Sequence, residues 1–291
     1  MSAQAHAANH YYIPHGTHWP IIGSVGLFIT AVGGALWLEG MDIGRYFVLL
    51  GVIVILIMMF GWFGTVIRES LSGTYNEQVD RSFRWGMTFF IFSEVMFFGA
   101  FFGALFFARV FVEHWLAGSS NNLFTNLLLW KGYEPTWPSN GPANLGGSFE
   151  GMSAVGVAAI NTLILLTSGL TVTIAHWGLK QGNRKKLCWF LLFTILLGFS
   201  FVALQAHEYI EAYTKQNLTL GSGIYGSTFF MLTGFHGLHV TIGAIMLSVI
   251  LIRSLRGHFT PQNHFAFEAV SWYWHFVDVV WLGLFIFVYW L

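Results

Sequence analysis

The stretch WGMTFFIFSEVMFFGAFFGALFFARVFV, residues 85–112, decides the fold because it is long and apolar enough to cross a bilayer as a helix. It carries one carboxylate, Glu94, near its middle. At a rise of about 1.5 Å per residue, Glu94 lies roughly 14 Å along the helix from Trp85, close to the midplane of the hydrocarbon core. An ionised acid there is costly unless it is protonated, paired or hydrated. Glu94 is therefore either a functional acid or a protonated one that hydrogen-bonds a neighbouring helix.

The composition of the whole chain agrees with a membrane environment. Of its 291 residues, 55% are hydrophobic and only 9% are charged, whereas soluble domains carry about 25% charged residues. The formal net charge of zero argues against nucleic acid as a partner. The single cysteine, Cys188, excludes an intrachain disulfide framework and any Cys-based zinc or iron–sulfur site. We therefore expect an all-α integral membrane protein.

Seven apolar segments are each long enough to span a bilayer. They are residues 20–38, 46–67, 85–112, 152–179, 187–213, 223–252 and 269–290. We expect a polar inside tail over 1–18, two helices over 19–67, an inside linker over 68–84 and a five-helix bundle over 85–291. The tail holds His6, His10, His15 and His18 without regular spacing, which favours a solvated segment over a metal-binding tract.

The distribution of basic residues predicts the orientation. Nine of them fall on the N-terminal side of the membrane and four on the other: Arg68, Arg81, Arg84, Lys180, Arg184, Lys185, Lys186, Arg253 and Arg256, against Arg45, Arg109, Lys131 and Lys215. The N-terminus is therefore expected in the cytoplasm or its equivalent, and the C-terminus outside. The one long loop, 113–151, then lies outside as a structured cap or a mobile flap.

Three of the apolar helices carry polar side chains. These are His207 and Glu208 in the fifth helix, His236 and His239 in the sixth, and His275 and Asp278 in the seventh. Two histidines three apart share a helix face and could ligate haem, copper or zinc. Interhelical hydrogen bonding is the alternative, and we favour it because neither an HExxH motif nor a cysteine cluster supports a metal. We predict no metal site in this chain.

A further set of residues is placed to meet lipid head groups at the inner interface. Trp62, Phe63, Arg68 and Glu69 lie at the inner end of the second helix, and Arg253 and Arg256 end the sixth. Basic residues beside aromatic ones can bind an anionic lipid. Ordinary positive-inside anchoring explains the same residues equally well.

Several motifs together resemble a known family. VIRES (66–70), FIFSEVMFFGAFF (90–102), LQAHEYIEA (204–212), YGSTFFMLTGFHGLHVTIGA (225–244) and HFAFEAVSWYWHFVDVVWLGLF (264–285) closely resemble subunit III of the haem–copper cytochrome c oxidases. The resemblance extends over nearly the whole chain from the second helix onward. It is weakest in the first helix and in the 113–151 loop, which is longer than in mitochondrial forms. That length suggests a bacterial plasma membrane, with the mitochondrial inner membrane as the alternative.

The resemblance implies an accessory subunit that holds no redox cofactor, because in this family haem and copper belong to subunits I and II. Its two helix groups form a V-shaped cleft that holds phospholipid, and it packs against subunit I, sustains proton uptake there and protects the oxidase during turnover. Cytochrome c is contacted only through subunit II. Glu94 matches the carboxylate of the family's SEV segment, and Arg68, Glu69 and Arg253 match its lipid contacts. Trp62 and Phe63 match an aromatic pair in which the family has two tryptophans.

The resemblance also assigns the histidines and two acids: it implies that His207, Glu208, His236, His239, His275 and Asp278 are structural or lie in a polar interior. Two other functions stay open. The chain could be the equivalent subunit of a quinol oxidase, since the donor site lies on subunit II. It could also be a self-contained proton carrier that uses Glu94, Glu208 and Asp278.

Overall fold

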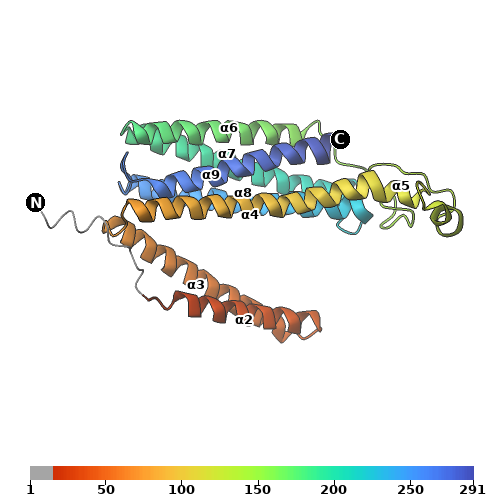
Figure 1. Cartoon of the computed structure of the whole chain (residues 1–291), viewed down its shortest axis with the longest axis horizontal. Coiled ribbons are helices and arrows are strands. Elements are labelled where there is room, and N and C mark those ends of the chain that lie inside the picture. Colours follow the sequence, from red (N-terminus) through yellow and green to blue (C-terminus); the bar gives the residue numbers. More distant parts are fainter. Residues whose placement is uncertain (1–15) are drawn as a thin grey trace, which may run out of the picture. The chain divides into compact units, whose positions relative to one another are not determined.

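The computed structural model describes residues 16–291, and in this part of the chain every regular element is a helix. Seven helices are long and apolar enough to cross a membrane, which confirms the predicted all-α membrane fold (Figure 1). They are α2 (Trp19–Leu38), α3 (Ile43–Leu71), α4 (Glu77–Phe107, continued by η1, Ala108–Val112, and α5, Glu113–Leu116), α6 (Val157–Lys180), α7 (Arg184–Lys215), α8 (Gly223–Leu255) and α9 (Phe265–Leu284, continued by η3, Phe285–Trp290). His6, His10 and His15 of the expected tail lie outside the described residues.

The chain divides into two compact units, Met1–Trp85 and Gly86–Leu291, and the division falls inside α4. In the first unit α2 packs along α3 through small residues. A Cβ on Gly44 would lie 2.4 Å from the backbone nitrogen of Trp37, and one on Gly51 would lie 2.3 Å from Thr30 Oγ1. Glycine at these positions is what allows the two backbones to approach closely, as in other helix pairs in lipid. An arrangement of two helix groups around a cleft stays a prediction.

The expected linker 68–84 differs from the structure, because α3 and α4 both extend into it and only residues 72–76 lie outside a helix. Polar residues can continue a helix beyond the membrane when their side chains hydrogen-bond the unpaired backbone groups at its end. Here Asn76 accepts a hydrogen bond from the backbone in the first turn of α4, and Arg84 Nε lies 2.8 Å from Asp80 Oδ2 one turn earlier. Counting apolar residues alone misses such extensions.

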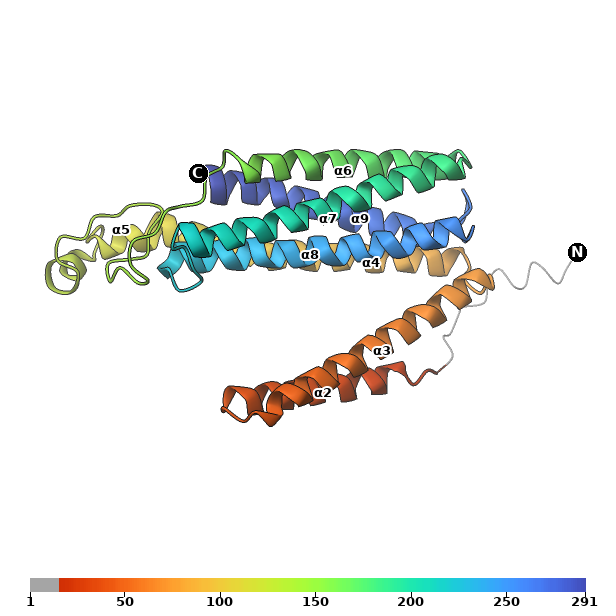
Figure 2. The same cartoon turned by 180° about the vertical axis from the view of Figure 1, so that it is seen from behind.

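In the second unit, α6–α9 form a bundle, and the part of α4 that begins at Gly86 runs along it next to α8 and α9 (Figures 1 and 2). The fully buried Trp274 of α9 contacts three of these helices. Its indole Nε1 donates a hydrogen bond to Ser168 Oγ on α6 at 2.9 Å. Cβ atoms placed on Gly198 of α7 and Gly243 of α8 would each lie 2.7 Å from its ring. Because these two glycines have no side chain, they leave the space that the Trp274 ring occupies.

The long loop 113–151 is a structured cap on this unit. It starts as the short helix α5, contains η2 (Thr125–Leu129) and is tied to the connection between α7 and α8. Ser139 O accepts a hydrogen bond from Tyr225 N–H at 3.1 Å, and Asn217 Nδ2 donates to Ser148 O at 2.9 Å. Inside the loop, Tyr133 donates its hydroxyl to Glu113. Of the two interpretations of this loop, these contacts favour the cap over the flap.

Candidate functional site

The carboxylate of Glu94 on α4 is paired with a histidine of α8. Its Oε2 lies 2.9 Å from His239 Nε2, and both side chains are mostly buried. The rings of Phe98 and Tyr273 flank the imidazole, with centroids 5.1 Å and 6.3 Å from it. Glu94, the one carboxylate in the apolar stretch 85–112, therefore has a polar partner from another helix.

The protonation of this pair follows from its second hydrogen bond. His239 Nδ1 lies 2.6 Å from the carbonyl oxygen of Phe235. A carbonyl only accepts, so Nδ1 carries a proton and Nε2 faces Glu94 with one further proton shared between them. Whether that proton rests on the imidazole or on the carboxyl, the pair as a whole is neutral. Neutral pairing removes most of the cost of an acid inside an apolar bundle.

His236, three residues before His239, is placed differently. It is fully buried, and neither ring nitrogen has a hydrogen-bond partner among the described residues. Its ring stacks on Trp281 with centroids 5.2 Å apart and meets the edge of Phe201 at 5.6 Å. Among the described residues, the histidine pair of α8 does not form part of a group able to hold a metal ion.

Glu208 on α7 is a second buried acid with partners of its own. Only 2% of the residue is exposed. Tyr289 donates its hydroxyl to Glu208 Oε2 at 2.9 Å, and Gln205 Nε2 donates to the same oxygen at 3.0 Å. The preceding residue, His207, departs from the expected interior position: its side chain is 61% exposed and lies 4.0 Å from Glu211. One residue turns a helix by about 100°, so a neighbour of the inward Glu208 points away from the bundle.

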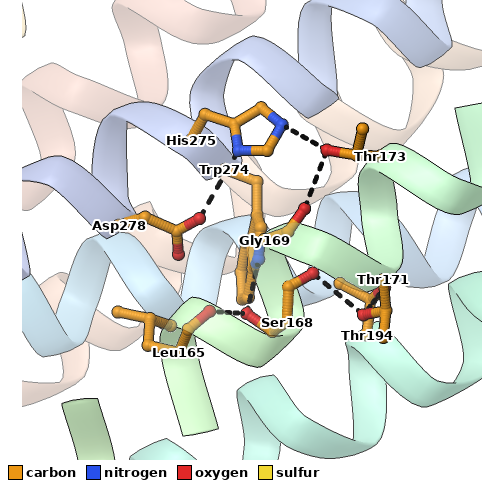
Figure 3. Close-up of polar contacts among 9 residues, drawn as sticks. All are labelled: Leu165, Ser168, Gly169, Thr171, Thr173, Thr194, Trp274, His275 and Asp278. Carbon is orange, nitrogen blue, oxygen red and sulfur yellow. Dashed lines mark hydrogen bonds and ion pairs between the residues drawn. The ribbon is translucent and has the colours of Figure 1, made fainter. Parts of the chain in front are cut away.

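The third acid, Asp278, lies between α9 and α6 (Figure 3). Its Oδ2 is 3.5 Å from His275 Nδ1, and His275 Nε2 is 3.3 Å from Thr173 Oγ1. Close by, Ser168 accepts the indole N–H of Trp274 and donates its own hydroxyl to Leu165 O at 2.6 Å. His275 and Asp278 thus belong to a polar contact between two helices.

The residues expected at lipid head groups are divided between the two units. In the first, Trp62 and Phe63 are 52% and 59% exposed, with ring centroids 6.4 Å apart. Arg68 donates to Thr65 Oγ1 at 3.2 Å, and Glu69 accepts from the hydroxyl of Tyr75 at 2.7 Å. The aromatic pair is therefore exposed in this unit.

In the second unit, Arg253 is only 8% exposed and its guanidinium lies 4.6 Å from the ring centroid of Phe259, whereas Arg256 is exposed. A cavity of about 260 Å³ borders this end of α8, and Arg184 and Phe259 are among its lining residues. Arg184 Nε donates to Ser254 O at 3.0 Å. Arg184, which was expected only as an orienting charge, thus lines this cavity.

Sequence reasoning also missed the partners of the buried acids. Tyr289, which donates to Glu208, and Thr173, beside His275, come from other helices, and hydrophobic spacing does not pair them. Gln205, by contrast, lies on the same helix three residues before Glu208. His176 was missed as well: it lies on α6, far in sequence from His264 and Glu268, which it contacts. The one available signal was the spacing of four between His264 and Glu268, which puts them on one helix face.

Comparison with known proteins supports the resemblance drawn from the motifs. The sequence model of the cytochrome c oxidase subunit III family matches residues 9–121 and 134–291. The chain belongs to the cytochrome c oxidase subunit III family. The unmatched residues 122–133 fall in the long loop and include η2.

Curated relatives in this family match the chain over almost its full length. Cytochrome c oxidase subunit 3 of Carassius auratus is 41% identical over 287 residues, covering 98% of each chain. The subunits of Tetraodon nigroviridis (40% over 287 residues, 98% of each) and Gadus morhua (41% over 291 residues, 100% of this chain and 99% of the relative) are similar. Membership of the family makes the chain an integral membrane subunit of an oxidoreductase complex that contains other oxidase subunits.

Proposed function

We propose that this member of the subunit III family is an accessory, cofactor-free subunit of a proton-pumping terminal oxidase that transfers electrons from cytochrome c to oxygen. It stabilises subunit I, holds phospholipid and sustains proton uptake into subunit I. The catalytic centre lies in the partner subunits, and cytochrome c is reached only through subunit II. The observation that carries this proposal is the neutral pair of Glu94 and His239. In this pair, the acid that matches the family's intramembrane carboxylate is hydrogen-bonded to a histidine of a neighbouring helix.

The other two buried acids support a structural role in the same way. Glu208 accepts hydrogen bonds from Tyr289 and Gln205, and Asp278 faces His275. Tyr289 links η3 to Glu208 of α7, and His275, which pairs with Asp278 on α9, also contacts Thr173 of α6. These links are the arrangement expected of interhelical contacts. A self-contained proton carrier would instead have to release and reload these protons, and we expect the purified chain alone to move none across liposomes.

We further propose that Trp62, Phe63, Arg68 and Glu69 in the first unit, and Arg253 and Arg256 in the second, contact phospholipid. The exposed aromatic pair offers apolar surface beside the Arg68 charge, which suits an anionic head group and its acyl chains. The Arg68→Ala variant should lose lipid from the purified complex. The control is Arg45→Ala at the other end of α3, also exposed, and mass analysis of co-purifying lipids compares the two. Equal lipid content in both variants would contradict the lipid site.

The membrane is proposed to be the bacterial plasma membrane, with the N-terminus cytoplasmic. The length of loop 113–151 supports a bacterial source over the mitochondrial inner membrane, and residues 122–133 of this loop lie outside the family match. The curated relatives named above are subunits of cytochrome c oxidases, which favours cytochrome c over quinol as the electron donor.

Removing this chain from the oxidase tests the proposed function. The complex purified without it should keep the optical spectra of its haems, because no haem is proposed to lie in this chain. Its activity should start normally and decay during turnover, as proton supply to subunit I fails. Matched samples of the intact complex should hold their activity over the same number of turnovers. Loss of haem absorbance on removal of the chain would refute the assignment.

A further inference from the structure

Three side chains that the proposed function does not use meet at one end of the second unit. His176 lies near the end of α6, His264 directly precedes α9, and Glu268 is in the first turn of α9. Glu268 Oε1 is 3.6 Å from His176 Nε2 and 3.4 Å from His264 Nε2. All three ligand atoms lie within 4.8 Å of one another, and no other group of this kind occurs in residues 16–291.

The two distances from Glu268 to the histidines fit neighbouring ligands of a tetrahedral metal ion. Zinc binds imidazole nitrogen and carboxylate oxygen at about 2.0–2.2 Å, so two ligands on one tetrahedron lie about 3.4 Å apart. The two distances to Glu268 are within a few tenths of an ångström of that value. Two histidines and a glutamate also form a known ligand set, in which water takes the fourth position.

The orientation of the rings supplies an independent indication. His264 Nδ1 lies 3.2 Å from the carbonyl oxygen of Thr260, which can only accept, so Nδ1 carries the proton and the lone pair of Nε2 faces the cluster. Metal-binding histidines are commonly fixed in this way by a second hydrogen bond. His264 is more than nine-tenths buried, and the Nε2 atoms of His176 and His264 are both buried without a hydrogen-bond partner.

The charges near the cluster also favour a cation. If no ion binds, Glu268 can neutralise only one imidazolium, and the other histidine must stay neutral with a buried, unpaired nitrogen. Such a nitrogen costs free energy. A divalent ion accepts the lone pairs of both nitrogens at once, with the carboxylate as its third ligand. Lys180, one turn after His176, adds a positive charge, but its side chain is exposed to solvent and is screened.

We propose that His176, His264 and Glu268 bind a divalent transition-metal ion of the zinc type, with water as the fourth ligand. The ion links α6 to the start of α9 and fixes the connection between α8 and α9. It has a structural role without redox chemistry, it is independent of the function proposed above, and it revises the expectation that this chain holds no metal.

Zinc binding by the purified oxidase complex tests the site. The complex is stripped with a chelator and dialysed against Zn²⁺, and bound zinc is measured per haem by mass spectrometry. His264→Ala and His176→Ala should each hold one zinc fewer than the wild type at low micromolar Zn²⁺. We expect affinity to fall by about 100-fold or more, since loss of even an outer partner costs about 10- to 100-fold. His207→Ala, an exposed histidine that lies 4.0 Å from Glu211, is the matched control and should bind as the wild type does.

Two further measurements keep the result decisive. Glu268→Asp keeps a carboxylate and should retain part of the affinity that Glu268→Ala loses. If a variant does not assemble, the wild-type complex is soaked in Zn²⁺ and anomalous diffraction is measured at the zinc edge. A peak between the three side chains supports the site. Equal zinc content in the wild type and the His264 and His176 variants, or no peak between the three side chains, would overturn the proposal.

Discussion

Glu94 and His239 each offset the energetic cost of burying the other. An unpaired carboxylate or imidazole among apolar helices is costly, whereas a pair that shares one proton is neutral and fully hydrogen-bonded on its facing atoms. The pair also joins α4 to α8 across the second unit. Its chemistry therefore suits a contact between helices better than a step in proton transport.

A double-mutant cycle at this pair measures its contribution. Glu94→Leu and His239→Phe should each destabilise the complex by about 1 kcal/mol, because each leaves a buried polar group without its partner. The double variant should lose less than the sum of the two, since no unpaired group remains. The thermal midpoint of the purified oxidase reports these differences. Strict additivity would show that the two side chains do not interact.

The Glu94→Gln variant separates structure from proton pumping. A glutamine amide donates a hydrogen bond to His239 Nε2 while His239 Nδ1 still donates to Phe235 O, so the contact survives without a titratable group. The number of protons pumped per electron in reconstituted vesicles should equal that of the wild type. Glu94→Ala should pump equally well but show a lower thermal midpoint. A loss of pumping in Glu94→Gln would place this acid on the pumping path.

The sequence predicted these residues individually but not as pairs. Glu94 stood out because a charge in an apolar helix is conspicuous, and His239 because it is one of two histidines on α8. Their contact joins positions 145 apart in sequence, and periodicity within one helix says nothing about which face meets which neighbour. The same limit hid the contact of Tyr289 with Glu208 and that of His176 with Glu268.

At the scale of helices, α9 is fixed by the insertion of Trp274 among α6, α7 and α8. The ring fills the space left by Gly198 and Gly243, and its indole N–H bonds Ser168. Tight interiors tolerate neither cavities nor added atoms well. The packing of four helices in this unit therefore depends on the absence of two side chains.

Adding a methyl group at either glycine tests this packing. Gly198→Ala and Gly243→Ala should each lower stability by about 1–3 kcal/mol, because the fully buried Trp274 has no free space to move into. Gly237→Ala on α8 is the control, since a Cβ there meets nothing within 4 Å and alanine is the better helix former. Thermal unfolding of the complex, monitored through the release of this chain, compares the three variants. Equal effects of all three variants would contradict the role of Trp274.

The helix boundaries show what apolar length does and does not predict. The seven spans were predicted because each is a long apolar run, and the structure has all of them. The polarity of residues 68–84 predicts a linker, yet α3 and α4 continue through most of them. A helix ends where its backbone is capped, as at Asn76, and not where the hydrophobic segment stops.

At the scale of the whole molecule, seven spans put the two termini on opposite sides of the membrane, and the basic residues predict which side is which. The connection between α6 and α7, which Lys180 and Arg184 flank, should face the cytoplasm, and the cap 113–151 should face outward. The proposed metal site lies at the same end of the second unit as Lys180. The orientation therefore also decides from which compartment that site is loaded.

The single native cysteine makes this orientation straightforward to measure. In a Cys188→Ser background, Asn121→Cys places a thiol in the exposed cap, and Gln181→Cys places one at the exposed end of α6. A membrane-impermeant maleimide added to spheroplasts should label position 121 and leave position 181 unlabelled, because a charged reagent does not cross the bilayer. Both should react after permeabilisation, which controls for thiol accessibility. Labelling of position 181 alone in sealed spheroplasts would reverse the topology and place the metal site on the outer face.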